Sequence, residues 1–101
     1  MNSKYIAKDK LLIFEIDEEI DHHMAEILKR KADYEIEKYM PAKTIFDFNG
    51  VSFMDSAGIG MVLGRYKFAK MLGGTIEMTN VNPGIKKVFE TCGIPKIIKM
   101  S

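Results

Sequence analysis

Residues 53–67 read FMDSAGIGMVLGRYK, and their pattern is the strongest single indication of how the chain folds. An apolar run ends at Met54, two polar residues follow, and apolar residues then recur at three- and four-residue steps, as expected where a strand leads through a cap into a helix. A glycine inside a helix costs about 1 kcal/mol relative to alanine. The glycines here therefore indicate that something approaches the first turns of the helix closely. They are Gly58, Gly60 and Gly64.

On both sides of this stretch, strand-like and helix-like segments alternate. Apolar runs and alternating patterns predict strands, and the apolar stripe within residues 21–39 predicts a long helix. The resulting order predicts an α/β fold with helices packed on a mixed, mostly parallel sheet of four to five strands, with an antiparallel hairpin at the front. The expected strands are Tyr5–Ala7, Leu11–Ile16, Thr44–Phe48, Thr75–Thr79 and Ile97–Ile98.

Caps and helix-breaking residues set the ends of the three expected helices. Asp21 and Asn82 are the expected N-caps of the first and third, while Pro41 and Gly73–Gly74 end the first and second. Cys92, at the end of the third helix, is expected to be a small core residue. The first helix should turn one charged face away from its apolar stripe. That face carries Glu26, Lys29, Arg30, Asp33 and Glu37.

Size and composition are those of one small globular domain, residues 1–101. Lys plus Arg number 15 against 14 Asp plus Glu, so neither a nucleic-acid nor a membrane surface is expected. A single cysteine and the lack of a signal-like or membrane-spanning run favour a cytoplasmic protein. His22 and His23 are adjacent and cannot form the i, i+4 pair of a helical metal site. We therefore expect neither metal nor cofactor.

Ser56 is the residue with the most chemical potential, and four roles are open to it. A serine hydrolase would carry glycine two residues before and two residues after its nucleophile. Gly58 fits the second position, but Met54 stands at the first. A phosphate-binding loop would need a glycine spacing that this segment lacks. Ser56 is alternatively a plain N-cap. Finally, phosphorylation would add about 1.5 to 2 negative charges, which a helix N-terminus tolerates, so its effect would fall on an interface.

The same segments resemble a known family. Residues 53–67 are similar to the signature of the anti-sigma factor antagonists of the STAS domain family, and Ile20–Glu26 is similar to a second characteristic segment. Gly73–Gly74 and Lys96–Ile98 also fit, so the resemblance covers nearly the whole chain. It implies the STAS fold and a regulatory protein that is not an enzyme. The sporulation antagonists are the most similar branch, with the general-stress antagonists second and other STAS regulatory modules as a further alternative.

The resemblance implies a partner switch. An antagonist of this family binds an anti-sigma factor that is also a serine kinase, and a sigma factor is thereby freed. The kinase then phosphorylates the serine after the signature aspartate, here Ser56, and a serine phosphatase reverses the step. The next position is often another hydroxyl residue in the family, so Ala57 leaves one acceptor.

The partner surface is expected around this serine, on a protein that is monomeric when free. Asp21 would belong to it as a contact, as a cap, or as both, and Arg65 is either an interface residue or part of a solvated face. Relatives usually continue into a final helix beyond the last residue here. The residues we assign to the partner surface are Asp21, Asp55, Ser56, Ala57, Gly58, Ile59, Gly60, Gly64 and Arg65.

Overall fold

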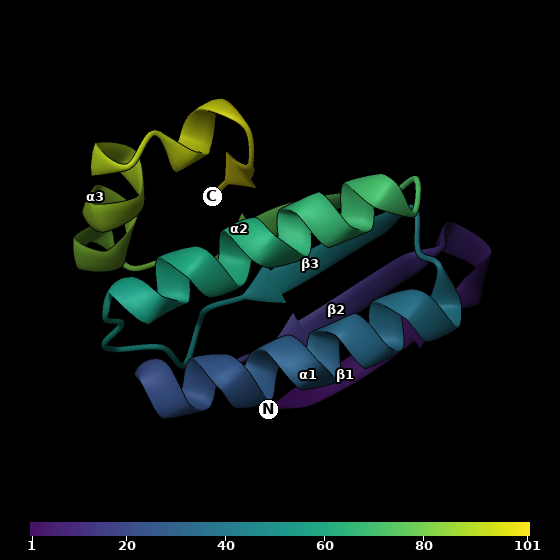
Figure 1. Ribbon diagram of the computed structural model, residues 1–101, viewed down its shortest axis with the longest axis horizontal. Coiled ribbons are helices and arrows are strands. Elements are labelled where there is room, and N and C mark those ends of the chain that lie inside the picture. The colour runs from purple at the N-terminus through teal and green to yellow at the C-terminus, as the bar shows by residue number, and fades with distance from the viewer.

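A computed structural model describes residues 1–101 and shows one five-stranded sheet with three α-helices (Figure 1). The strands lie in the order β1-β2-β3-β4-β5, with β1 antiparallel to β2 and every other pair parallel. The mixed, mostly parallel α/β fold is confirmed. The elements are β1 (Asn2–Ile6), β2 (Leu11–Glu15), α1 (His22–Tyr39), β3 (Lys43–Asp47), α2 (Ser56–Met71), β4 (Thr75–Thr79), α3 (Pro83–Thr91) and β5 (Lys99–Met100), with short 3-10 turns at Ala7–Asp9 and Ile94–Lys96.

Helices α1 and α2 run side by side over one face of the sheet, and both begin at the edge where the parallel strands end (Figure 1). Alternate strand residues point into the layer between sheet and helices, because successive side chains of a strand point to opposite faces. Phe14 and Phe46 are paired across β2 and β3, with ring centroids 5.5 Å apart. The residues buried there from the three central strands are Leu12, Phe14, Thr44, Phe46, Ile76 and Met78.

Helix α3 closes the end of the sheet beyond β3, near the start of α2 (Figure 1). Phe89 of α3 meets Phe48 edge to face, with centroids 6.0 Å apart. Asn82, confirmed as the N-cap, accepts from Ile85 N and donates through Nδ2 to Val51 O at 3.0 Å. This second bond fixes the loop that leads into α2.

The expected bounds of the first and last strands and the expected burial of Cys92 are wrong. The first strand lies earlier, at Asn2–Ile6, because Ala7 already begins a 3-10 turn. The last strand is Lys99–Met100, while Ile98 is a fully buried core residue just before it. Cys92 is exposed rather than buried, because α3 ends there and Gly93 turns the chain with a φ of 74°.

A charged pair joins the two long helices. Arg65 on α2 is only 6% exposed, and its Nε lies 2.6 Å from Asp33 Oδ1 on α1. The expectation that Asp33 faces solvent is therefore wrong, as is the alternative that placed Arg65 on a solvated face. No helix of this fold has the length and apolar character needed to cross a membrane.

Replacing Asp33 with alanine should destabilise the protein, because it leaves the Arg65 guanidinium buried without its counter-charge. Breaking a fully buried ion pair costs about 3–5 kcal/mol. The Asp33 side chain is 29% exposed, so we expect a loss of about 2 kcal/mol in the free energy of unfolding, measured by urea denaturation. Glu37→Ala, at an exposed position of the same helix, is the control. Equal stabilities of the two variants would contradict the assignment.

Candidate functional site

The start of α2 presents the Ser56 hydroxyl to solvent. Asp55, not Ser56, is the N-cap, with an extended backbone and a side chain that accepts from Ala57 N at 2.8 Å. Ser56 is the first helical residue, is exposed, and its Oγ makes no hydrogen bond within the protein. The plain N-cap role is thus taken by the neighbouring aspartate, and the hydroxyl is left free.

The backbone amides at this helix start are nearly all satisfied. Asp55 N donates to Ile20 O at 3.0 Å, Gly58 N to Asp55 O at 3.0 Å, and Ala57 N to the Asp55 carboxylate. The Ser56 N–H is the one amide of the first turn with no partner in the chain. A free N–H at the positive end of a helix dipole favours a nearby anion.

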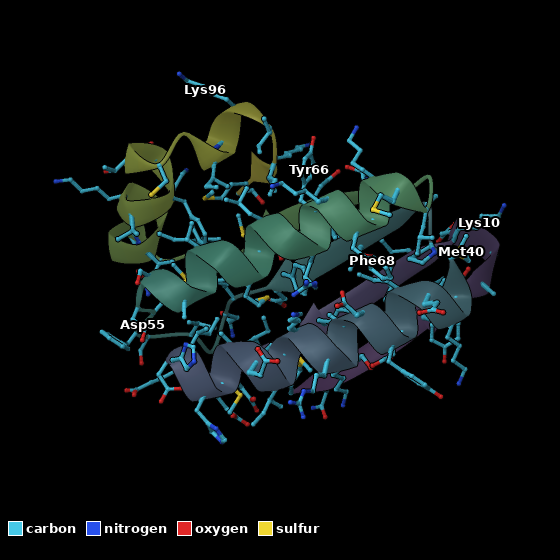
Figure 2. The ribbon with its side chains drawn as sticks, in the orientation of Figure 1. Lys10, Met40, Asp55, Tyr66, Phe68 and Lys96 are labelled. Carbon is cyan, nitrogen blue, oxygen red and sulfur yellow. The ribbon has the colours of Figure 1, made fainter.

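A short backbone bridge holds the two helix starts together. Ile20 and Met54 pair in parallel fashion, with Ile20 N donating to Phe53 O at 3.0 Å. Asp21 follows directly and caps α1 by accepting from Met24 N at 2.8 Å. The Asp21 and Ser56 segments therefore lie close together, and Figure 2 shows Asp55 at the same end of the molecule as the beginning of α1.

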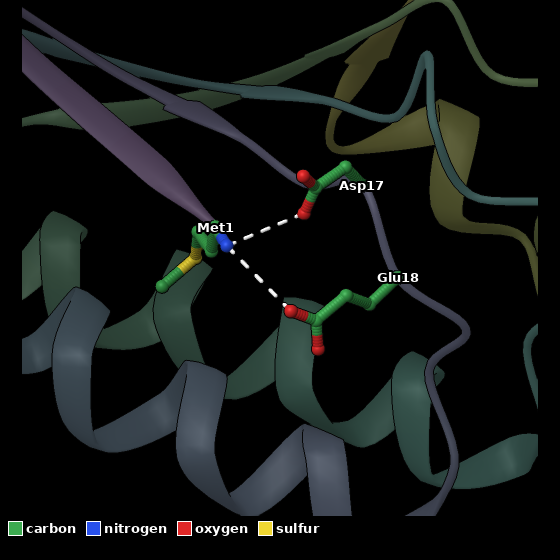
Figure 3. A network of polar contacts seen from close by, with 3 residues as sticks. All are labelled: Met1, Asp17 and Glu18. Carbon is green, nitrogen blue, oxygen red and sulfur yellow. Dashed lines mark ion pairs between the residues drawn. The ribbon is translucent and has the colours of Figure 1, made fainter.

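The loop between β2 and α1 is tied to the N-terminus (Figure 3). The Met1 amino group lies 3.3 Å from Asp17 Oδ1 and 3.7 Å from Glu18 Oε1. Gly50 approaches the same loop closely, since a Cβ there would meet the Asp17 Cα at 2.5 Å. These contacts fix the chain just before Asp21.

The three glycines of α2 have different surroundings. A Cβ on Gly58 would overlap the Met54 side chain, so this glycine makes room for a neighbour in the same chain. A Cβ on Gly60 or on Gly64 would meet nothing within 4 Å. The expected room for close approach therefore exists at Gly60 and Gly64, where the structure offers no internal reason for glycine.

Gly60 and Gly64 line a shallow groove of about 380 Å³ between α1 and α2. The groove begins at Ala57, next to Ser56, and runs toward Arg65. Of the lining residues on α1, Glu26 and Lys29 were expected on an outward face; both are exposed, and they also form the rim of the groove. All lining residues are His22, Ala25, Glu26, Lys29, Ala57, Gly60, Met61, Gly64 and Arg65.

The structure brings the Asp21 segment and the start of α2 to one end of the molecule, and Ala57, Gly60, Gly64 and Arg65 line the groove. Ile59 does not line it and is half-buried against the core. The structure also adds Phe53, whose side chain is 51% exposed three residues before Ser56. An exposed aromatic side chain next to a polar helix start is a common anchor for a protein partner. Its place in an apolar run made Phe53 look like a strand residue. The only sequence signal for its exposure is its position, beyond the strand that ends at Asp47 and three residues before Ser56.

Comparison with known proteins identifies the class. The STAS domain model matches residues 3–101. The anti-sigma F factor antagonist of Paenibacillus polymyxa is 31% identical over 87% of this chain and 75% of its own length. The anti-sigma-B factor antagonist of Bacillus subtilis is 30% identical over 82% and 74%. This chain belongs to the STAS domain family, among its anti-sigma factor antagonists.

The solved structures agree with this class. The unphosphorylated form of SpoIIAA, an anti-sigma factor antagonist, superposes with a TM-score of 0.83 at 27% identity, covering 99% of this chain and 86% of that one. The phosphorylated form of Bacillus SpoIIAA gives a TM-score of 0.75 over 99% and 89%. Proteins of this class regulate by binding and are not enzymes.

The different surroundings of Gly58 and Gly64 predict that alanine at these two positions changes the stability of the protein in opposite directions. Gly64→Ala should stabilise the protein by about 1 kcal/mol, because alanine is the better helix former and meets no atoms. Gly58→Ala should destabilise it by about 1–3 kcal/mol, because the added methyl group must displace Met54 from a packed site. Thermal unfolding measures both changes. A stabilised Gly58→Ala variant would show that Met54 yields freely and would contradict the packing argument.

Proposed function

We propose that Ser56 is the phosphoacceptor of a partner switch in which the unmodified protein binds an anti-sigma factor serine kinase and frees a sigma factor. The observation that carries this proposal is the Ser56 hydroxyl, which is exposed and free of hydrogen bonds at the first position of α2. A related antagonist is known in unphosphorylated and phosphorylated forms. The protein acts in the cytoplasm, is monomeric when free, and returns to its binding form through a serine phosphatase.

Phosphorylation at this position acts on the interface rather than on the fold. The dianion would lie at the positive end of the α2 dipole, beside the unpartnered Ser56 N–H, which stabilises negative charge. Asp55 carries a like charge next to it, so the surface becomes strongly anionic. A partner seated on Asp21, Asp55 and Ala57 through Gly60 would have to desolvate this new charge, and it dissociates.

We assign the sigma factor to the sporulation branch. The anti-sigma F factor antagonist of Lysinibacillus sphaericus is 36% identical over 75% of this chain and 65% of its own length, and the Paenibacillus polymyxa relative is also an anti-sigma F factor antagonist. The Asp-His-His segment at residues 21–23 supports this choice. The general-stress branch is the second candidate, because the anti-sigma-B factor antagonist is 30% identical.

Phosphate mapping after incubation with each purified anti-sigma factor of the host and Mg-ATP tests both assignments. We expect one phosphate, on Ser56, and only from the kinase of the sporulation system. Ser56→Ala should keep its affinity and take no phosphate. Ser56→Asp should bind roughly 30-fold or more weakly, since an unpaired charge in an interface costs about 2 kcal/mol or more.

The stability of Ser56→Asp separates an interface effect from a folding effect. An acidic residue at a helix N-terminus is favourable, so its free energy of unfolding should stay within about 0.5 kcal/mol of the wild type. Ser52→Ala changes the exposed serine of the loop before α2 and should leave phosphorylation unaltered. Phosphate on Ser52, or tight binding by Ser56→Asp, would refute the switch.

A further inference from the structure

The groove between α1 and α2 has no occupant within the chain. Gly60 and Gly64 form part of its wall one and two turns beyond Ala57, and neither glycine is required by packing, since an added Cβ meets no atom within 4 Å. Each of these glycines weakens the helix relative to alanine. An open wall kept at the expense of helix stability indicates that another molecule approaches the backbone of α2 here.

The charges around the groove leave one cation unmatched. Glu26 lies 3.7 Å from Arg30, and Asp33 lies 2.6 Å from Arg65. Lys29, on the α1 rim, makes no ion pair. Lys29 is thus a lining cation without an acidic partner, and an anionic group would complement it.

Arg65 gives the groove donors as well as charge. Arg65 is a buried residue that lines the groove, and its guanidinium makes one hydrogen bond, from Nη1 to Met61 O at 3.4 Å. Its Nε contacts Asp33 as an ion pair without a well-aligned hydrogen bond. A guanidinium has five N–H donors, so several remain for the oxygens of a ligand. Carboxylates match this fork of donors.

We propose that a carboxylate side chain of the anti-sigma factor enters the groove over Gly60 and Gly64 and binds between Lys29 and Arg65. This inference rests on the proposed function and names the chemistry of the partner at the same surface. The groove is continuous with the start of α2, because Ala57 lines it and is the neighbour of Ser56. Eight residues of helix separate Ser56 from Gly64, about 12 Å at 1.5 Å per residue, well within a standard interface.

The binding affinity of alanine variants for the purified anti-sigma factor tests the groove. Gly60→Ala and Gly64→Ala should each raise the melting temperature and still weaken binding roughly tenfold, because the methyl groups fill the space that the partner needs. Gly84→Ala is the matched control. It is also a helical glycine whose Cβ meets only Asn82 Oδ1, at 3.5 Å, so it should leave affinity unchanged. Unchanged affinity in both groove variants overturns the proposal.

Zero-length crosslinking tests the carboxylate itself. A carbodiimide adds to a carboxylate and activates its carbonyl carbon. The Lys29 amine then attacks this carbon, the carbodiimide leaves as a urea, and an amide bond joins the two side chains. Mass spectrometry of the complex should show Lys29 joined to an aspartate or glutamate of the anti-sigma factor. Lys31, which is exposed elsewhere on α1, should give no such product. Crosslinks from other lysines but none from Lys29 overturn the proposal.

The outcomes separate this inference from the partner switch. If the wild-type protein does not bind or become phosphorylated, the switch fails, and the groove proposal fails with it. If the wild type binds and is phosphorylated on Ser56 but both groove variants bind equally well, the switch stands and the groove proposal alone fails. Self-association of the wild type that Gly64→Ala abolishes would assign the groove to a second copy and also overturn it.

Discussion

The backbone bridge between Ile20 and Met54 is the contact on which the rest of the site depends. It joins the segment before α1 to the segment before α2, with Ile20 donating to Phe53 O and accepting from Asp55 N. The two helix starts therefore occupy fixed positions at one edge of the sheet, and the groove between the helices begins at the same place. The edge where parallel strands end is where open α/β sheets generally bind their ligands.

Local sequence signals were sufficient for the order of elements, the antiparallel hairpin and the caps Asp21 and Asn82. They left a plain N-cap as one of the roles of Ser56, whereas the structure gives that role to the preceding Asp55. Aspartate and serine are both strong N-caps, so adjacent positions are not distinguished by residue type. The local signals also missed the Asp33–Arg65 pair. Its two residues are 32 positions apart. Helical periodicity distinguishes the apolar face of a helix from the polar face, but it does not say which polar residues meet a neighbouring helix.

The sequence also indicated that the glycines of α2 leave room for a close approach, but it could not tell which of them make room for a neighbour in the chain and which face open space. One pattern serves two purposes: Gly58 lets Met54 pack inside the protein, while Gly60 and Gly64 face open space. The same limit applies to Cys92. Its spacing from Ile85 and Phe89 fits the apolar side of a helix, and it is exposed because α3 stops at that residue. For Gly58 the deciding factor is where the Met54 side chain packs, and for Cys92 it is where the helix ends, and residue spacing specifies neither.

The burial of Arg65 has a consequence for binding kinetics. A free arginine side chain loses about 2 kcal/mol of rotamer freedom when it is immobilised. Here Asp33 and the walls of α1 and α2 already immobilise it in the folded protein. A ligand that reaches this guanidinium meets donors in a preorganised arrangement, so little conformational entropy is lost on association. Such a rigid contact favours long residence of the partner, which makes a covalent signal such as phosphorylation a natural means of release.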